Sequence, residues 1–325
     1  MSQTTKEIKN RIKSIQSTKK MTKAMEMVAA SKMKKAISKV LTTRPFSIEA
    51  WKIFTTLVDS LSEDRIIQQS NKVEEVKNIL AVLFSPDRGF CGSFNSQLLK
   101  KFSEEINDKN RLKTVRYKGQ WLKSHIPDDQ IKVDFIVIGK KGEKMIHKMN
   151  GNIIETYQSF NNIPKFTTIR PIAQLILEKF NDRTYQKVIL IYTDFISIVS
   201  RKAKMRQLLP ISRFSIKKSI AEITNIKAKK LENEVSFEKK DYLIEPDVET
   251  VFKLLMPRLI EMQIYHALLE SKAAEESARM IAMNNATDAA KKIAAQLTLK
   301  YNQLRQMKIT QEISEISAGK SALES

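Results

Sequence analysis

A long hydrophobic seam runs through the last third of the chain. From Phe252 to Leu304, apolar residues recur at alternating spacings of three and four, which is the repeat of a coiled-coil helix. The seam comprises Phe252, Leu255, Leu259, Met262, Leu269, Ala273, Met280, Met283, Ala290, Ala294, Leu297, Tyr301 and Leu304, with polar interruptions at His266, Glu276 and Thr287. This pattern predicts a helix from Pro257 to about Ser317, roughly 90 Å long at ~1.5 Å per residue. Pro257 either begins that helix or kinks it, because proline fits without distortion only in a first turn.

The N-terminal part of the chain carries a second helical pattern. Its apolar positions fall on one slowly drifting face and comprise Ile8, Ile12, Ile15, Met21, Met25, Val28, Met33, Ala36, Ile37 and Val40. They predict a helix from Lys6 to about Leu41. A related pattern continues to Leu61 after a kink or break at Pro45. The N-terminal helix is therefore predicted to be the shorter of the two.

The two terminal helices most simply pair as an antiparallel hairpin, with the middle of the chain inserted at its turn. Because the lengths differ, the C-terminal end should project alone. That end remains apolar on one face at Ile309, Ile313 and Ile316. An isolated amphipathic helix is marginal in water, since most helix stability comes from packing. The sequence therefore predicts that another protein surrounds this tip.

The middle third changes to strands alternating with helices. Continuous apolar runs at 78–84, 133–138 and 188–192 predict strands that are buried on both faces. Helical stretches are predicted at about 93–106, 141–149 and 168–180. The expected fold class is α/β plus a long antiparallel α-helical coiled coil, with an inserted Rossmann-like α/β domain. The expected segments are 1–62 for the N-terminal helix, 75–245 for the α/β domain and 247–325 for the C-terminal helix, with a lysine-rich insertion at 212–240.

Charge is distributed unevenly along the chain. The net charge is +21, and residues 1–44 hold twelve Lys and Arg against two Glu, whereas residues 247–318 hold nine basic and nine acidic residues. A basic helix attracts nucleic acid, an anionic membrane or an acidic protein, and charge alone does not choose among them. No apolar run approaches the roughly 20 residues of a membrane span, so direct membrane insertion is not expected. A single cysteine, Cys91, excludes an internal disulfide framework and fits a reducing compartment.

The residues predict no catalytic, cofactor-binding or metal-binding site. Asp87–Gly92 and Gly139–Gly142 each follow a strand and precede a helix, but both lack the Lys-Ser/Thr of a phosphate loop, so tight turns are the better interpretation. The three histidines share no metal-ligand spacing with each other or with Cys91. Cys91 has no visible base beside it. An enzyme is therefore the weakest of the possible functions.

Several segments together resemble one known family. They are Lys6–Ile8 (KEI), Ile15–Met33 (IQSTKKMTKAMEMVAASKM), Asp87–Gly92 (DRGFCG), Glu276–Met283 (ESARMIAM) and Gln306–Ile316 (QMKITQEISEI). In this order, and over nearly the whole chain, they are similar to the gamma subunit of the F-type, proton-translocating ATP synthase.

The resemblance implies a non-catalytic central rotary stalk that couples proton flow to binding changes at the catalytic beta subunits. The implied partners are three alpha and three beta subunits around the coiled coil, the epsilon subunit and the membrane c-ring, with no cofactor. Family positions that contact beta correspond here to Lys20, Lys23, Met25, Arg279, Arg305, Gln306, Thr310 and Glu312. The implied location is peripheral, on the cytoplasmic face of a bacterial inner membrane, since no transit-like segment precedes the first helix; a mature mitochondrial chain would show the same pattern.

Two other classes fit the physical features. A basic coiled-coil protein could bind nucleic acid, although no aromatic residues interleave with its Lys and Arg; salt-dependent DNA binding would favour that class. A membrane-surface scaffold could use the basic amphipathic N-terminus, and liposome binding without partner subunits would favour it.

Overall fold

The computed structural model describes residues 5–60, 76–117, 120–123, 126–158, 164–211 and 244–324. The chain divides into two compact units. Unit 1 combines residues 1–30 with 279–325, and unit 2 comprises residues 31–278. The lysine-rich stretch at 212–240 lies outside the described residues.

Two long helices contribute to both units. Helix α1 is Thr5–Ser60, with 56 residues, and helix α9 is Val248–Glu324, with 77 residues. Both contain an internal proline, Pro45 and Pro257, so the prediction that Pro257 could begin the long helix is wrong. The helix begins earlier because Asp247 acts as its N-terminal cap.

The Asp247 carboxylate accepts hydrogen bonds from the Thr250 amide (2.9 Å) and the Thr250 hydroxyl (2.7 Å). The amide bond is the main reason why the pKa of Asp247 lies below its ordinary value. Aspartate is among the preferred capping residues because it satisfies amides that have no partner within the helix. The cap therefore sets the start of α9 ahead of its proline.

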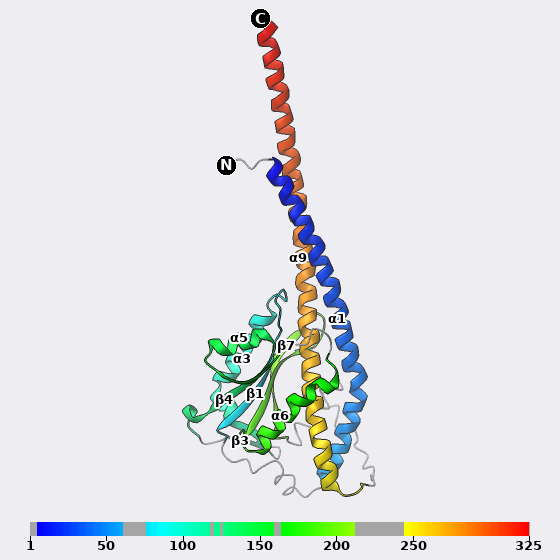
Figure 1. The fold of residues 1–325 in the computed structure, drawn as a ribbon, viewed down its shortest axis with the longest axis vertical. Coiled ribbons are helices and arrows are strands. Elements are labelled where there is room, and N and C mark those ends of the chain that lie inside the picture. Colours follow the sequence, from blue (N-terminus) through cyan, green and yellow to red (C-terminus); the bar gives the residue numbers. More distant parts are fainter. Residues whose placement is uncertain are drawn as a thin grey trace. The chain divides into compact units, whose positions relative to one another are not determined.

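Unit 2 contains a five-stranded sheet in the order β5-β4-β1-β6-β7 (Figure 1). The strands are β1 (Asn78–Phe84), β4 (Lys132–Ile138), β5 (Asn152–Tyr157), β6 (Lys187–Phe195) and β7 (Arg201–Leu209). The first four are parallel, and β7 pairs antiparallel with β6. The strand that comes first in the chain, β1, lies at the centre of this sheet. The chain adds β4 and β5 on one side of β1 and then β6 and β7 on the other side, as in doubly wound α/β folds. A separate two-stranded ribbon pairs β2 (Thr114–Tyr117) with β3 (Gln120–Lys123).

Helices cover both faces of the sheet. They are α3 (Phe94–Asn107), α4 (Lys109–Lys113), α5 (Lys140–Lys148) and α6 (Arg170–Asn181), with short 3-10 turns at η1 (Asp128–Gln130) and η2 (Phe166–Ile169). Side chains of α3 and α5 join one hydrophobic cluster with the sheet, and those of α6 and α9 join another on the opposite face. The predicted fold class is confirmed, as are the three predicted strands and the three predicted helices. Strands β5 and β7 and the β2–β3 ribbon were not predicted.

Within unit 2, α1 and α9 pack through a third cluster that includes Trp51, Phe54 and Phe252. The rings of Phe54 and Phe252 stack with centroids 5.1 Å apart. A polar contact lies in the same helix pair, where His266 Nε2 is 2.7 Å from Ser47 Oγ. The His266 interruption of the seam is therefore a buried, hydrogen-bonded position.

The carboxyl ends of β1 and β4 are bonded to each other. Ser85 Oγ lies within hydrogen-bond distance of two carbonyls, those of Ile138 (3.1 Å) and Gly139 (2.9 Å), which share its one proton, and it accepts from the Gly142 amide (2.8 Å). Gly139 has φ +104°, and a Cβ placed on it would lie 2.0 Å from the Ser85 carbonyl oxygen. Only glycine fits at this junction.

We expect Gly139→Ala to lower the free energy of unfolding by about 2–3 kcal/mol, from the unfavourable φ and the displaced Ser85 backbone. Gly89→Ala is the matched control, because a Cβ added to Gly89 would have nothing within 4 Å and the φ of this residue is not in the left-handed region. Urea denaturation of both variants measures the difference. Equal losses in the two would contradict the close approach at Gly139.

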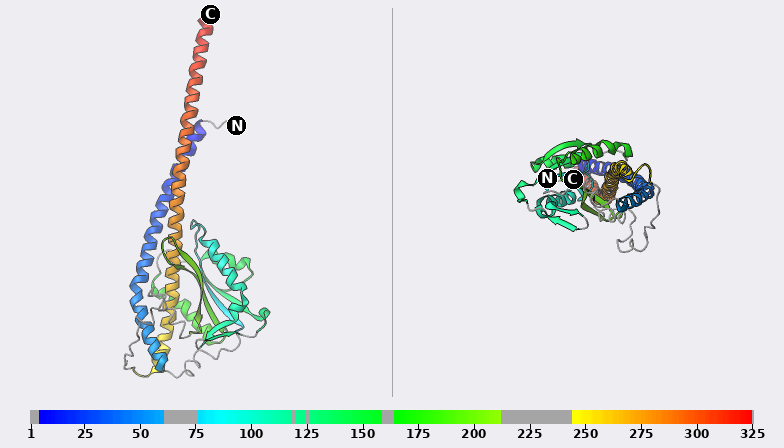
Figure 2. Two further views of the ribbon diagram at one scale, coloured as in Figure 1. Left: turned by 180° about the vertical axis from the view of Figure 1, so that it is seen from behind. Right: turned by 90° about the horizontal axis from the view of Figure 1, so that it is seen from below.

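Unit 1 is an antiparallel pair formed by the first part of α1 and the last part of α9. Figure 2 shows the blue start of α1 winding along the orange part of α9, with the red end of α9 extending past it. Most of the buried residues described here are small or polar: Thr22, Ala29, Thr287 and Ala290. Ile8 and Met283 are the larger apolar exceptions.

Candidate partner-contact surface

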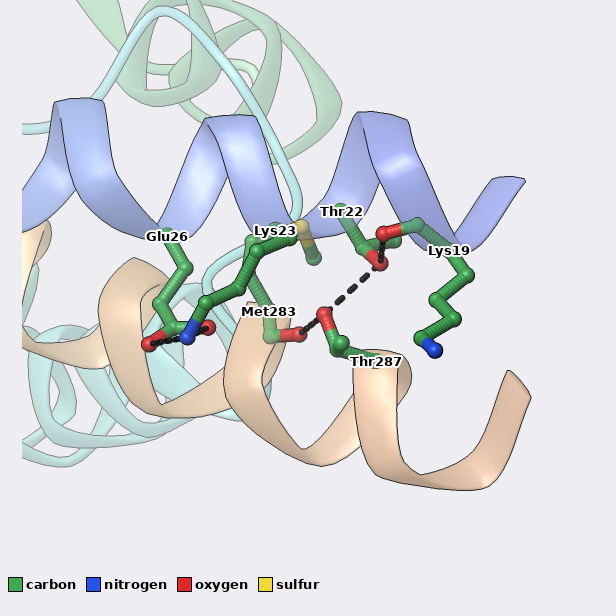
Figure 3. Close-up of polar contacts among 6 residues, drawn as sticks. All are labelled: Lys19, Thr22, Lys23, Glu26, Met283 and Thr287. Atoms are coloured by element: carbon green, nitrogen blue, oxygen red, sulfur yellow. Dashed lines mark hydrogen bonds and ion pairs between the residues drawn. The ribbon is translucent and has the colours of Figure 1, made fainter. Parts of the chain in front are cut away.

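A direct polar contact shows the register of the helix pair in unit 1. Thr22 Oγ1 of α1 lies 2.8 Å from Thr287 Oγ1 of α9 (Figure 3). In an antiparallel pair, moving 17 residues from each threonine brings Thr5, the first residue of α1, level with Leu304. The predicted overhang is therefore present: every residue from 305 to 320 is exposed.

The overhanging tip carries exposed apolar side chains. Met307, Ile309, Ile313 and Ile316 are 67%, 47%, 62% and 73% exposed. Single exposed apolar residues are normal, but a succession of them along one unpaired helix is typical of a surface that another molecule covers. The tip thus has the character of a contact surface, and its predicted coverage by another protein stays a prediction.

The eight predicted contact residues all belong to unit 1, but they form two groups. Lys20, Lys23 and Met25 are exposed on α1, and Arg279 is half-buried on α9 at the level of the end of this α1 segment. Arg305, Gln306, Thr310 and Glu312 are all exposed on the tip. Arg279 and Arg305 are separated by about 39 Å along the helix at ~1.5 Å per residue. The eight predicted residues therefore lie on two candidate surfaces, here called the α1 surface (Lys20, Lys23, Met25 and Arg279) and the tip surface (Arg305, Gln306, Thr310 and Glu312).

The α1 surface is strongly basic. Residues 5–30 hold seven Lys and Arg and two Glu. Lys23 Nζ donates to both carboxylate oxygens of Glu26, at 2.9 and 3.0 Å. Lys23 is half exposed in this pair, and exposed ion pairs contribute only about 0–1 kcal/mol, so a stronger acidic partner can displace Glu26 at little cost. The surface suits an acidic protein segment.

The loops that resembled phosphate-binding turns bond to each other. At the start of α5, the amides of Lys140 and Lys141 donate to Asp87 Oδ1 (2.9 Å) and to the Pro86 carbonyl (3.1 Å). The Gly142 amide is bonded to Ser85 in the same way. A phosphate at the N-terminus of α5 would need these amides as hydrogen-bond donors, and they already have acceptors within the protein. The geometry supports their interpretation as tight turns.

The described residues offer little for catalysis. Among them, no three His, Cys, Asp or Glu side chains lie close enough to hold a metal ion. Cys91 is a buried free thiol. The buried Lys187 ammonium donates to the carbonyls of Arg111, Leu112 and Thr114 at the end of α4, and burial lowers its pKa to about 8. Lys187 therefore caps the C-terminus of α4, and this structural role accounts for its burial without a catalytic role.

One exposed apolar surface in unit 2 was not predicted. Ile196, Ile198 and Val199, at the turn between β6 and β7, are 57%, 47% and 79% exposed. Phe90, in the loop after β1, is 69% exposed. Because β1 and β6 are parallel neighbours, both segments leave the same edge of the sheet. In the sequence, residues 195–199 continue the apolar run of β6, so the hydrophobic pattern gives no sign of a turn there.

Within the described ranges, no helix has the length and apolar character needed to cross a bilayer.

These features define a class: a protein whose terminal helices form an antiparallel coiled coil and whose intervening residues form a doubly wound α/β domain. Comparison with known proteins specifies the family. The family model described as ATP synthase matches residues 4–323. The ATP synthase gamma chain of Heliobacterium modesticaldum is 36% identical over 318 residues, covering 98% of each chain. That of Stenotrophomonas maltophilia is 34% identical, covering 98% of this chain and 99% of the relative.

This chain belongs to the ATP synthase gamma chain family. Solved structures agree on the fold. A chain from the Euglena gracilis mitochondrial ATP synthase (OSCP/F1/c-ring) matches with a TM-score of 0.61 at 17% identity, covering 98% of this chain and 94% of that one. A chain from the central stalk and c-ring of the Tetrahymena thermophila mitochondrial ATP synthase matches with a TM-score of 0.55 at 24% identity, covering 82% and 99%.

Proposed function

We propose that this chain is the central-stalk rotor subunit of an F-type ATP synthase. The observation that carries the proposal is the unpaired tip of α9, whose exposed apolar residues require a surrounding partner. A ring of three alpha and three beta subunits supplies such a collar. The structures with similar folds come from complexes described by a central stalk, F1 and a c-ring, which supports the same assignment.

The α1 surface and the tip surface are the proposed contacts with the beta subunits. Lys20, Lys23 and Met25, with Arg279 on the neighbouring helix, present basic and soft apolar groups to acidic segments of beta. Arg305, Gln306, Thr310 and Glu312 present polar groups within the collar. Arg and Met are enriched at the centres of protein interfaces, which agrees with these roles.

The mechanism follows from asymmetry. An antiparallel pair of unlike helices presents α1 on one side and α9 on the other, so three identical beta subunits around it contact different surfaces. Each beta subunit then favours a different nucleotide-binding state, because a partner shifts an equilibrium only by its differential contacts. Rotation driven by proton flow exchanges these states in sequence. The chain itself is non-catalytic and requires no cofactor.

The remaining partners are the epsilon subunit and the c-ring, with unit 2 placed toward the ring. The exposed Phe90 and the β6–β7 turn give unit 2 an apolar surface for such protein contacts. The chain would be peripheral, on the cytoplasmic face of a bacterial inner membrane.

Co-expression with alpha and beta subunits from the same source tests the proposal. We expect a complex of three alpha, three beta and one copy of this chain, in which steady ATP hydrolysis requires this chain. Failure to assemble would contradict it. Salt-dependent DNA binding by the isolated chain would then favour the nucleic-acid alternative, and liposome binding would favour a membrane scaffold.

Charge reversal on the α1 surface should weaken the assembled complex. Lys20→Glu with Lys23→Glu replaces attraction by repulsion toward acidic segments of beta, so we expect an affinity loss of about tenfold or more at low salt, which shrinks as salt screens the charges. Lys144→Glu with Lys148→Glu, a double charge reversal at exposed positions of α5 in unit 2, is the control. Affinity measured by titration at two ionic strengths checks the result. The same loss in both variants would indicate a general charge effect.

A further inference from the structure

We propose that Thr22 and Thr287 form a polar tie that fixes the position of α1 against α9 in unit 1. The inference rests on the proposed function for its biological meaning, because Thr22 lies between Lys20 and Lys23 of the α1 surface. Its structural basis is independent of that function. The tie holds these contact residues at one height and one rotation on the coiled coil.

Both hydroxyls are buried and each has two contacts. Thr22 Oγ1 lies 3.1 Å from the Lys19 carbonyl, Thr287 Oγ1 lies 2.8 Å from the Met283 carbonyl, and the two hydroxyls are 2.8 Å apart (Figure 3). Each hydroxyl has one proton to donate. The two hydroxyl protons can fill only two of these three contacts, and we assign them to the two shorter ones. Thr287 then donates to the Met283 carbonyl, and Thr22 donates to Thr287 Oγ1 and not to the Lys19 carbonyl. The Lys19 carbonyl loses little, because as a helical carbonyl it already accepts from the amide four residues on.

The apolar packing around the tie specifies position only weakly. Ala29 and Ala290 are buried neighbours in the seam, and Met283 is flexible. Small side chains bury little area, and methionine adapts to many shapes. A shift of one heptad would place Thr22 opposite Ala294 or Met280, neither of which offers a hydroxyl. The native register is therefore the one in which the cross-helix hydrogen bond forms.

A polar pair in a coiled-coil seam specifies position at a cost in stability. Replacing both partners by apolar groups of the same shape is nearly neutral or stabilising, because no polar group is left unsatisfied. Thr22→Val with Thr287→Val is such a replacement. A positional role and a merely stabilising role therefore predict different results for this double variant.

Spin-label distances in the full chain test the tie. Labels at Ser17→Cys and Lys292→Cys, in a Cys91→Ala background, occupy exposed positions level with each other on α1 and α9. We expect one narrow distance for the wild-type seam. In the double valine variant we expect the distribution to shift or broaden by about half a helical turn, ~3 Å, with a thermal midpoint no lower than that of the wild-type seam.

Two matched variants test whether the distance depends on the hydroxyls of Thr22 and Thr287 or on another property of these side chains. Thr22→Ser with Thr287→Ser keeps both hydroxyls and should keep the narrow distance. Thr18→Val with Thr298→Val removes hydroxyls that bond only their own helices, at exposed positions, and should also leave it unchanged. An unchanged distance in the double valine variant would overturn the proposal. A lowered thermal midpoint with an unchanged distance would overturn it too, in favour of simple stabilisation.

A second arm connects the tie to coupling. In the complete synthase in membrane vesicles, with alpha, beta and the membrane subunits present, the double valine variant should assemble but show less proton pumping per ATP hydrolysed, while the serine pair keeps the wild-type ratio. If the wild-type chain failed to assemble, the proposed function would fail, and the spin-label experiment would still decide the tie. If the valine pair broadened the distance but left the ratio unchanged, the tie would stand and its role in coupling would not.

Discussion

Removing residues 305–325 should leave the chain folded but reduce coupled ATP turnover of the complex by about tenfold or more. Every residue from 305 to 320 is exposed, so these residues of the deleted segment contribute no buried side chain to unit 1. The function lost is that of contacts with other subunits. Interface side chains that matter typically cost more than ~1 kcal/mol each when removed, so one or two of them among Arg305, Gln306, Thr310 and Glu312 account for about tenfold.

Two measurements on the same truncated chain check this prediction. Circular dichroism and urea denaturation should match the full chain apart from the helical signal of the missing residues. ATP hydrolysis by the complex with alpha and beta should fall, and so should proton pumping by the complete synthase in membrane vesicles. A control deletion that begins at residue 319 keeps all four polar contact residues and should retain most of the turnover. Full activity after removal of residues 305–325 would show that the collar does not use this tip.

Phe54→Ala should lower the free energy of unfolding by about 3–5 kcal/mol, the usual cost of deleting a buried aromatic ring. Phe54 is 1% exposed and stacks on Phe252, with Trp51 packed edge-on at a centroid distance of 5.7 Å. The ring belongs to the buried α1–α9 cluster in unit 2, so its removal leaves a cavity between the two helices. Urea denaturation followed by tryptophan fluorescence reports it directly, since Trp51 lies beside the site.

Phe46→Ala is the matched control on the same helix. Phe46 is 68% exposed, so its removal should change stability by no more than about 0.5 kcal/mol. Similar losses in the two variants would mean that Phe54 is not part of a packed core. A large loss for Phe54 alone would establish that α1 and α9 are held together here by the aromatic cluster.

Of the candidate site, the unpaired tip of α9 was predictable from the hydrophobic pattern. The tip required only a comparison of two helix lengths and the persistence of apolar residues such as Ile309 and Ile313. The roles of individual residues came from family resemblance, since exposed Lys, Arg and Gln carry no physical mark of their partner. The apolar turn at Ile196–Val199 was missed, because a reversal between two strands leaves no break in hydrophobicity when it lacks glycine and proline.

By itself the sequence determined the coiled-coil seam: all sixteen of its positions from Phe252 to Leu304 are buried or half-buried, because helical periodicity fixes which side chains share a face. It also determined the central strands, whose continuous apolar runs fit only a sheet covered on both faces.

Only the tertiary structure decided what the polar interruptions do. Thr287 meets Thr22 and His266 meets Ser47 across more than two hundred residues of chain, a separation over which no local pattern carries information. The tertiary structure also decided the burial of residues 259–278 of α9, which are buried or half-buried on every face of the helix. Their second buried face exists because the sheet packs against the helix, and burial by a distant element is a property of the assembled fold.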